Sequence, residues 1–439
     1  MDQGKEEAMK FLPYSLFDSD DPEDLWAWLG KTSKEVGTDF VAIPHNQNIS
    51  KGLMFPIADS YGDPITAEYA NTRMRWEPVV ETTQIKGDSE THPSLSPNDE
   101  FADFETYDHA IESGEQGEVS LFGDGFIGEL SDEDRQTLEE NQTRLATAGD
   151  YSRSGLLRGL AIEERIGANP YKFGLIGSTD SHTSMSSAEE DNFWGKMALD
   201  STPENTLDPS KVVVPPTSYG ADMGAAGLAA VWAKENTREG LLAAFQRKEA
   251  YATTGPRIEL RFFGSFSFRS RDAQAQDVAA VGYQKGVPMG GDLSGAESDD
   301  APSFLIRAVK DPVGANLDRV QVVKGSLDDR GAPVEQVYDV VWAGDREADE
   351  DGRLPAIGNT VNIETAEYSN TIGTAQLAAV WTDPDFDPDK RSFYYVRVLQ
   401  IPTPRHTLYD AVALGQAHPE EFPATIQERA YSSPIWYTP

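Results

Sequence analysis

The 439-residue sequence contains no cysteine. Disulfide bonds, thiolate metal sites and cysteine nucleophiles are therefore excluded, and any metal ion must be held by His, Asp, Glu or backbone groups. No apolar run approaches the ~20 residues that a membrane-spanning helix needs, so we expect no membrane partner. Glycine-rich phosphate loops, G-x-S-x-G elbows and dinucleotide fingerprints are also missing from the sequence. What remains open is carboxylate and imidazole chemistry.

Basic residues are scarce, with 37 Lys and Arg against 74 Asp and Glu and a net charge of −37. Binding a polyanion needs basic patches, so nucleic acid is not expected as a partner. Hydrophobic residues make up 38% of the chain, which is enough for packed cores. Residues 1–8 show no signal-peptide pattern, and the compartment stays open between periplasm and cytoplasm.

The first half, residues 1–257, alternates helical and strand patterns, which is typical of an α/β fold. Asp21 and Pro22 predict the start of a helix that ends at Gly37. A second helix is expected at 152–166 and a polar one at about 131–148. Apolar runs predict strands at 39–44, 76–84 and 173–176.

The second half, residues 258–439, has a different character. Short runs that favour strands are separated by turn signals, and helical periodicity is scarce. The sequence therefore predicts an all-β, sandwich-like domain from residue 258 onward. The aromatic segment 430–437 is expected to pack back onto the body of the protein.

The strand at 173–176 runs into a small-residue loop that carries Asp180 and His182. In extended chain, residues two apart point to the same side, so this carboxylate and imidazole can converge on one metal ion. Such a donor pair suits zinc, manganese or iron. A buried Asp–His hydrogen bond that only fixes the loop is the alternative, and for the tripeptide alone the two are evenly matched.

Other polar side chains follow predicted strands in the same way. His45 comes directly after the strand at 39–44, and Glu81 lies within the strand at 76–84. Lys86, Glu90 and His92 follow in the next loop. Each of these alone fits a surface loop, but as a group after apolar strands they indicate a site. Arg257, at the end of the first half, is as well suited to a structural role as to binding a ligand anion.

Three elements together resemble the later metal motifs of the PHP (polymerase and histidinol phosphatase) superfamily. They are Ile43-Pro-His45-Asn, a strand with Glu81, and Gly177-Ser-Thr-Asp180-Ser-His182-Thr. The whole chain is similar to one bacterial branch, the domain of unknown function 3604 family. The stretches that carry this likeness are residues 12–26, 84–90, 173–182, 253–258 and 428–437.

The resemblance implies a partial PHP-like distorted β/α barrel in residues 1–257, with divalent metal ions at the C-terminal ends of its strands. It implies hydrolysis of phosphate esters or related anionic esters, including saccharide ones. The implied metal ligands are His45, Glu81, His92, Asp180 and His182. The implied catalytic side chains are Lys86, Glu90 and Arg257, of which Lys86 or Arg257 would pair with a phosphate or sulfate oxygen.

One departure from the superfamily pattern is serious. Members begin with an H-x-H motif, and this sequence contains none among its six histidines. We therefore expect a chain that lacks the N-terminal part of the domain, binds metal weakly and is inactive or nearly so. The rival interpretation is a non-catalytic binding or scaffold protein on a degenerate hydrolase fold. A polysaccharide-acting enzyme with an electrophilic metal differs only in its substrate.

Overall fold

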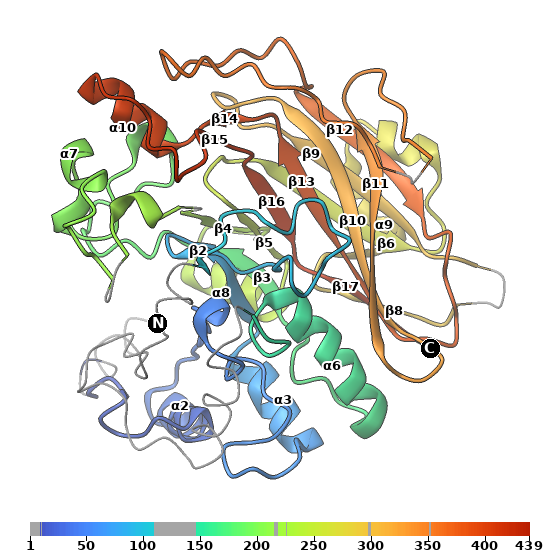
Figure 1. Cartoon of the computed structure of the whole chain (residues 1–439). Coiled ribbons are helices and arrows are strands. Elements are labelled where there is room, and N and C mark those ends of the chain that lie inside the picture. The colour runs from blue at the N-terminus through green and yellow to red at the C-terminus, as the bar shows by residue number, and fades with distance from the viewer. Residues whose placement is uncertain are drawn as a thin grey trace.

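The computed structural model describes residues 9, 11–108, 146–214, 218–224, 226–296, 300–350 and 353–439. These residues form a mixed α/β structure with several sheets and, within the described part, no closed barrel (Figure 1). The helix expected at about 131–148 lies mostly outside the described residues. No helix in the described ranges combines the length and apolar character needed to cross a membrane.

The helices of the described part are α2 (Pro22–Val36), α3 (Ala67–Trp76), α6 (Ser152–Ile166), α7 (Pro203–Thr206), α8 (Arg238–Gln246), α9 (Val278–Lys285) and α10 (His406–Leu414). Short 3₁₀ turns are η1 (Gln47–Ile49), η3 (Glu190–Asn192), η4 (Ala198–Asp200), η5 (Gly220–Asp222) and η6 (Ser270–Gln274). The strands are β1 (Val79–Gln84), β2 (Gly87–Asp88), β3 (Gly174–Gly177), β4 (Leu228–Val231), β5 (Ala250–Thr253), β6 (Glu259–Ser265), β7 (Val287–Pro288), β8 (Asp292–Ser294), β9 (Ser303–Val309), β10 (Leu317–Leu327), β11 (Pro333–Trp342), β12 (Gln376–Thr382), β13 (Ser392–Gln400), β14 (Thr403–Pro404), β15 (Thr425–Ile426), β16 (Arg429–Ser432) and β17 (Ile435–Thr438).

A small sheet of order β2-β1-β3 stands at the centre of the molecule (Figure 1). β1 and β3 are parallel, while β2 returns antiparallel to β1. All six residues of β1 and all four of β3 are buried, as expected for a parallel pair covered on both faces. The small sheet continues toward the large one, because Leu175 N donates to Ser433 Oγ at 3.0 Å and Gly227 N donates to Ser178 O at 2.9 Å.

The large sheet has the strand order β11-β10-β13-β16-β5-β4, with β17 and β8 attached beside β13. It takes β4 and β5 from the first half of the sequence and the other strands from the second half. β16 is the link, since its residues 429–431 pair with β13 on one side and its residues 430–432 pair with β5 on the other. Strands from both sides of residue 257 therefore share one continuous sheet.

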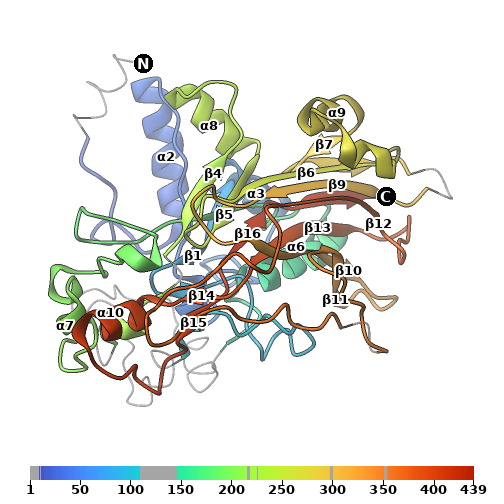
Figure 2. The same cartoon turned by 90° about the horizontal axis from the view of Figure 1, so that it is seen from above.

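A four-stranded sheet, β12-β9-β6-β7, faces the large sheet. Phe262, Phe304 and Ile306 of the smaller sheet share a core with Val320 and Val396 of the larger one. α9 covers the outer face of the four-stranded sheet and α6 the opposite face of the large sheet, which gives four layers (Figure 2). The prediction of a β-rich second half is confirmed.

The two principal helices of the first half form where the sequence predicts them. α2 begins with Pro22 and ends at Gly37, whose φ is 65°, and α6 ends at Gly167 with φ 74°. Glycine suits these left-handed C-caps because it has no Cβ to clash. Asp21 precedes α2, but its side chain makes no capping hydrogen bond.

The strand expected at 39–44 is wrong, because residues 38–46 have no regular secondary structure. This segment runs beside β1 but does not form a continuous strand ladder with it. Two hydrogen bonds join them: Ala42 N donates to Trp76 O at 2.8 Å, and Glu81 N donates to Pro44 O at 3.0 Å. The expected strand at 76–84 is also shorter, since Trp76 ends α3 and β1 begins at Val79.

Candidate functional site

β1 and β3 end side by side, and this shared edge positions the candidate site. In their parallel pairing Glu81 lies beside Ile176, and Thr83 beside Gly177. Gly177 has no room for a side chain, because a Cβ there would lie 2.9 Å from Thr253 O of β5. The chain segments that follow the two strands therefore leave the sheet at the same place.

A polar cluster lies beyond this edge, centred on Asp180. Lys86, two residues after β1, donates a hydrogen bond to Asp180 Oδ2. Lys196 Nζ donates to the same oxygen at 2.8 Å and to Asp180 O at 3.0 Å. His182 Nε2 lies 3.2 Å from Asp180 Oδ1 and 3.2 Å from Lys196 Nζ. We call these four residues the Asp180 cluster.

The cluster is closed on one side and open on the other. The side chains of Lys86 and Lys196 are 8% and 5% exposed, whereas that of His182 is 51% exposed. Asp180 adopts a left-handed backbone conformation with φ 47°, which Asp tolerates better than most residues. His182 therefore faces solvent, while the two lysines are almost covered.

A hydrogen-bonded turn presents Lys196. Asp200, fully buried, accepts hydrogen bonds from Met197 N at 2.7 Å and from Lys196 N at 3.0 Å. Gly195 has φ 67°, and a Cβ there would lie 2.6 Å from Asp200 O, so the turn needs glycine at this position. His182 N also donates to Lys196 O at 2.7 Å. Backbone and side-chain bonds thus tie the turn to the Asp180 cluster.

Glu81 lies beside the cluster, within charge interaction distance of both lysines. Ser178 Oγ donates to Glu81 Oε2, and Gln47 Nε2 donates to its backbone carbonyl. Glu81 Oε1 is buried and has no hydrogen-bond partner among the described residues. Burial raises the pKa of Glu81, against the opposing effects of the Ser178 hydrogen bond and then the Lys86 charge.

His45 lies on the loop that runs beside β1. Its neighbour Asn46 accepts a hydrogen bond from Gln84 Nε2 at 2.6 Å, which ties this loop to the end of β1. The His45 side chain is exposed, yet the surrounding chain desolvates it enough to lower its pKa. The charges of Lys86 and Lys196 lower that pKa further, which places His45 near the cluster.

The two lysines repel each other, and this shapes the electrostatics of the cluster. Burial, followed by the charge of Lys196, lowers the pKa of Lys86 to about 6, while the Glu81 charge acts in the opposite direction. Burial also lowers the pKa of Lys196. Two buried amines close together bind an anion favourably, because the negative charge stabilises the protonated form of both lysines.

His182 Nε2 lies between an acceptor, Asp180 Oδ1, and a donor, Lys196 Nζ. It cannot hydrogen-bond to both in one protonation state, because a ring nitrogen either carries a proton or offers a lone pair. Burial and the charges of Lys196 and then Lys86 lower the pKa of His182, which favours the neutral imidazole near pH 7. In the tautomer whose proton lies on Nδ1, Nε2 accepts a hydrogen bond from the Lys196 ammonium, and in the other tautomer Nε2–H donates to Asp180 Oδ1.

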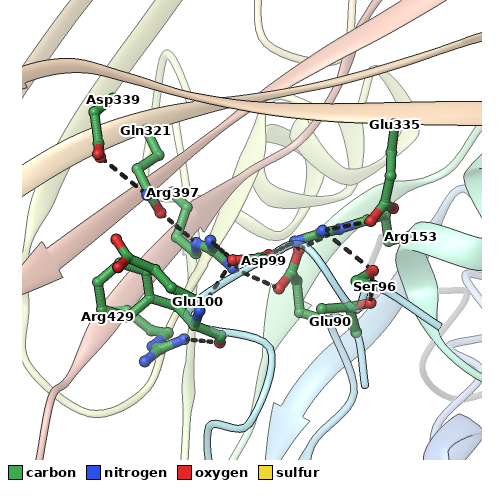
Figure 3. Close-up of polar contacts among 12 residues, drawn as sticks. Glu90, Ser96, Asp99, Glu100, Arg153, Gln321, Glu335, Asp339, Arg397 and Arg429 are labelled. Carbon is green, nitrogen blue, oxygen red and sulfur yellow. Dashed lines mark hydrogen bonds and ion pairs between the residues drawn. The ribbon is translucent and has the colours of Figure 1, made fainter. Parts of the chain in front are cut away.

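Glu90, expected in the site, instead lies in a buried group of ion pairs with Arg153 and Arg397 (Figure 3). Its Oε1 accepts hydrogen bonds from Arg153 Nε at 2.9 Å and from the Tyr395 hydroxyl. Arg397 Nη1 lies 3.2 Å from Glu90 Oε2 and also binds Asp99. All of these side chains are buried between α6, β13 and the loop after β2. We call them the Glu90 network.

His92 and Arg257 also lie outside the Asp180 cluster. His92 Nε2 is 3.0 Å from Asp108 Oδ1, and its Nδ1 is 2.7 Å from Ser94 Oγ, so both ring nitrogens have partners. Arg257 is 65% exposed and pairs with Glu189 at 3.2 Å. The structure thus brings together His45, Glu81, Lys86, Asp180 and His182, and it separates Glu90, His92 and Arg257 from them.

The side chains gathered here include the donor types that zinc, manganese or iron prefers, namely carboxylate oxygen and imidazole nitrogen. Among the described residues, however, no group of three or more His, Asp or Glu side chains is arranged to hold a metal ion. Asp180 Oδ2 already accepts from two lysines. As they stand, the described side chains do not fit a metal ion, and we assign no step to one.

Lys196 is the residue of the cluster that the sequence pattern does not reveal. It follows the DxH motif by fourteen residues, in the segment Phe193-Trp-Gly-Lys196, which carries no strand pattern. Only the return of the loop onto His182 brings it to the site. The buried Asp200 and the glycine before Lys196 are a weak signal of a specific turn.

Comparison with protein families supports the likeness to the domain of unknown function 3604 family. A search of curated proteins finds no match. The profile of the family described as "Protein of unknown function (DUF3604)" matches residues 1–439, and the chain therefore belongs to this family.

Proposed function

We propose that the protein is a hydrolase of the PHP type that acts on phosphate esters or related anionic esters at the Asp180 cluster. One observation carries this proposal: two buried lysines, Lys86 and Lys196, converge on one carboxylate where β1 and β3 end. In α/β folds, sites form at the C-terminal ends of parallel strands. The small sheet would then be the remaining part of a distorted β/α barrel.

The chemistry of each side chain fits an anionic ester. The two amines would bind its non-bridging oxygens and stabilise the negative charge that develops during hydrolysis. His182 is solvent-accessible, and its lowered pKa keeps it neutral near pH 7. When an ester oxygen replaces His182 Nε2 as an acceptor for Lys196, this nitrogen is free to accept a proton from an attacking water. Asp180 holds both lysines in position.

The PHP resemblance implies zinc, manganese or iron, with ligands from His45, Glu81, Asp180 and His182. The described side chains do not fit such an ion as they stand, because both lysines already bind Asp180, so we assign it no step. Because the sequence also has no H-x-H motif, we expect at most weak metal binding and slow turnover.

The direct test is hydrolysis of p-nitrophenyl phosphate and p-nitrophenyl sulfate by the purified chain, with and without added MnCl2 or ZnCl2. We expect slow hydrolysis of at least one ester, lost in Asp180→Asn. Asp208→Asn is the matched control, because the Asp208 carboxylate bonds locally, to Ser210 N at 2.9 Å, and not to the Asp180 cluster in the part of the chain that the structure describes. Equal rates for Asp180→Asn and the wild type would contradict the proposal.

The alternative is a non-catalytic binding or scaffold protein that uses the same cluster. Its supporting observation is that both lysines neutralise Asp180 and Glu90 lies in the Glu90 network instead of the site. Thermal stabilisation by inorganic phosphate, lost in Lys196→Met and unaccompanied by hydrolysis of either ester, would favour this alternative.

A further inference from the structure

The Lys196 ammonium has a contact pattern that an ordinary surface lysine lacks. An ammonium carries three N–H donors. Lys196 Nζ has three acceptors in the Asp180–His182 motif: Asp180 Oδ2 at 2.8 Å, Asp180 O at 3.0 Å and His182 Nε2 at 3.2 Å. These are a carboxylate oxygen, a carbonyl oxygen and an imidazole nitrogen, the same donor types that bind a divalent ion.

Burial makes the arrangement specific. An exposed ion pair contributes only about 0–1 kcal/mol and needs no particular geometry. The Lys196 side chain is 5% exposed, and burying a charge is costly unless hydrogen bonds satisfy it. The Asp200-braced turn holds the Lys196 backbone, and His182 N bonds to Lys196 O at 2.7 Å. Both the backbone and the side chain of Lys196 therefore hydrogen-bond to the Asp180–His182 motif.

We infer that Lys196 is the resident cation of this site, its ammonium occupying the position on Asp180 and His182 that a divalent ion would otherwise take. Lys86 reinforces this, since it donates to the same Asp180 Oδ2. A metal ion can bind these atoms only by displacing both side chains. The site therefore excludes divalent ions and receives its anionic ligand directly on lysine. The choice of ligand rests on the proposed function, whereas the exclusion of metal does not.

Isothermal titration with MnCl2 and with ZnCl2 tests the exclusion. We expect no saturable binding at Asp180 in the wild type and saturable binding at least tenfold tighter in Lys196→Met. The gain should disappear in the double variant Lys196→Met/Asp180→Asn. Lys234→Met, which removes the same charge from an exposed lysine, should behave like the wild type.

Lys196→Arg provides a check that does not depend on the Met variant being folded, because it keeps a cation in place and should exclude metal like the wild type. Far-UV circular dichroism establishes that each variant is folded. Tight metal binding by the wild type that Asp180→Asn abolishes would overturn the inference, as would unchanged metal affinity in a folded Lys196→Met. Neither readout requires ester hydrolysis, so failure of the proposed function would be seen separately.

Discussion

Asp88, a single residue on β2, shows how burial sets a protonation state. It is 3% exposed, and its Oδ1 accepts a hydrogen bond from Glu90 N at 2.7 Å. Its Oδ2 accepts one from the Tyr431 hydroxyl at 3.0 Å. Burial, and then the Glu90 charge, raises the pKa of Asp88 to about 7. The folded protein therefore binds a proton here that the unfolded chain releases near pH 4.

We predict that Asp88→Asn makes stability less dependent on pH. A raised carboxyl pKa means that Asp88 lowers stability as pH rises from about 4 to about 7, by about 1.4 kcal/mol for each unit of the shift. Asparagine keeps an acceptor for Glu90 N and cannot ionise. Urea unfolding of both proteins at pH 5 and pH 8 measures the difference. An equal change in the midpoints of the two proteins would contradict the prediction.

Some residues of the candidate site can be grouped from sequence patterns alone, and others are placed there by the path of the folded chain. Asp180 and His182 are adjacent on one loop, and His45 and Glu81 lie on segments that hydrogen-bond to each other, so strand reasoning is enough to group them. Lys196 reaches the site through a loop whose path depends on Asp200, which periodicity does not describe. The chain turns back at β2, and this turn carries Glu90 away from the site although it is only four residues beyond Lys86.

The Glu90 network joins secondary-structure elements that are far apart in sequence. It connects Arg153 of α6 with Arg397 and Tyr395 of β13, through Glu90 and Asp99 of the intervening loop (Figure 3). Burial alone would raise the pKa of Asp99, but Arg397 and then Arg153 hold it well below its usual range. The loop after β2 is therefore fixed by charge as well as by apolar contacts.

We predict that Glu90→Gln destabilises the protein strongly, because it leaves Arg153 and Arg397 short of one buried counter-charge. Breaking a buried ion pair by removing one partner costs about 3–5 kcal/mol. Glu335→Gln is the matched control: Glu335 is 21% exposed and lies 3.4 Å from Arg153, so its loss should cost under about 1 kcal/mol. Urea unfolding measures both. If Glu90 acts in catalysis instead, Glu90→Gln would lower ester hydrolysis and leave stability unchanged.

Cap residues and apolar runs predict where individual helices and strands lie, but they do not predict which strands pair in a sheet. The cap residues Gly37 and Gly167 locate α2 and α6, and short apolar runs locate strands of the second half, β9 and β12 among them. The run at 39–44 is as apolar as a strand, but it makes only separate hydrogen bonds beside β1. The nine-residue helix α10 gives too short a pattern to detect in a strand-rich region.

At the scale of the whole molecule, the shared sheet makes the two halves depend on each other. β5 from the first half pairs with β16 from the second. The same hydrophobic core contains Trp26 and Leu156 together with Phe393 and Trp436. Removing either half would expose strand edges and large aromatic side chains to water.

We therefore predict that residues 1–257, expressed alone, do not reach the native structure, and that the full chain unfolds in one transition. Differential scanning calorimetry of the full chain and far-UV circular dichroism of the fragment measure the two parts of this prediction. A fragment with native-like ellipticity and a cooperative melt would show that the first half folds independently.

The position of β16 between β5 and β13 also has a consequence for biosynthesis. The ribosome makes β5 well over a hundred residues before β16, so the centre of the large sheet cannot close until β16 has emerged. Until residue 432 has left the exit tunnel, β5 and β13 each present an unpaired edge. Nascent chains of this protein should therefore need chaperone protection late in translation, and synthesis halted before β16 should yield aggregation-prone products.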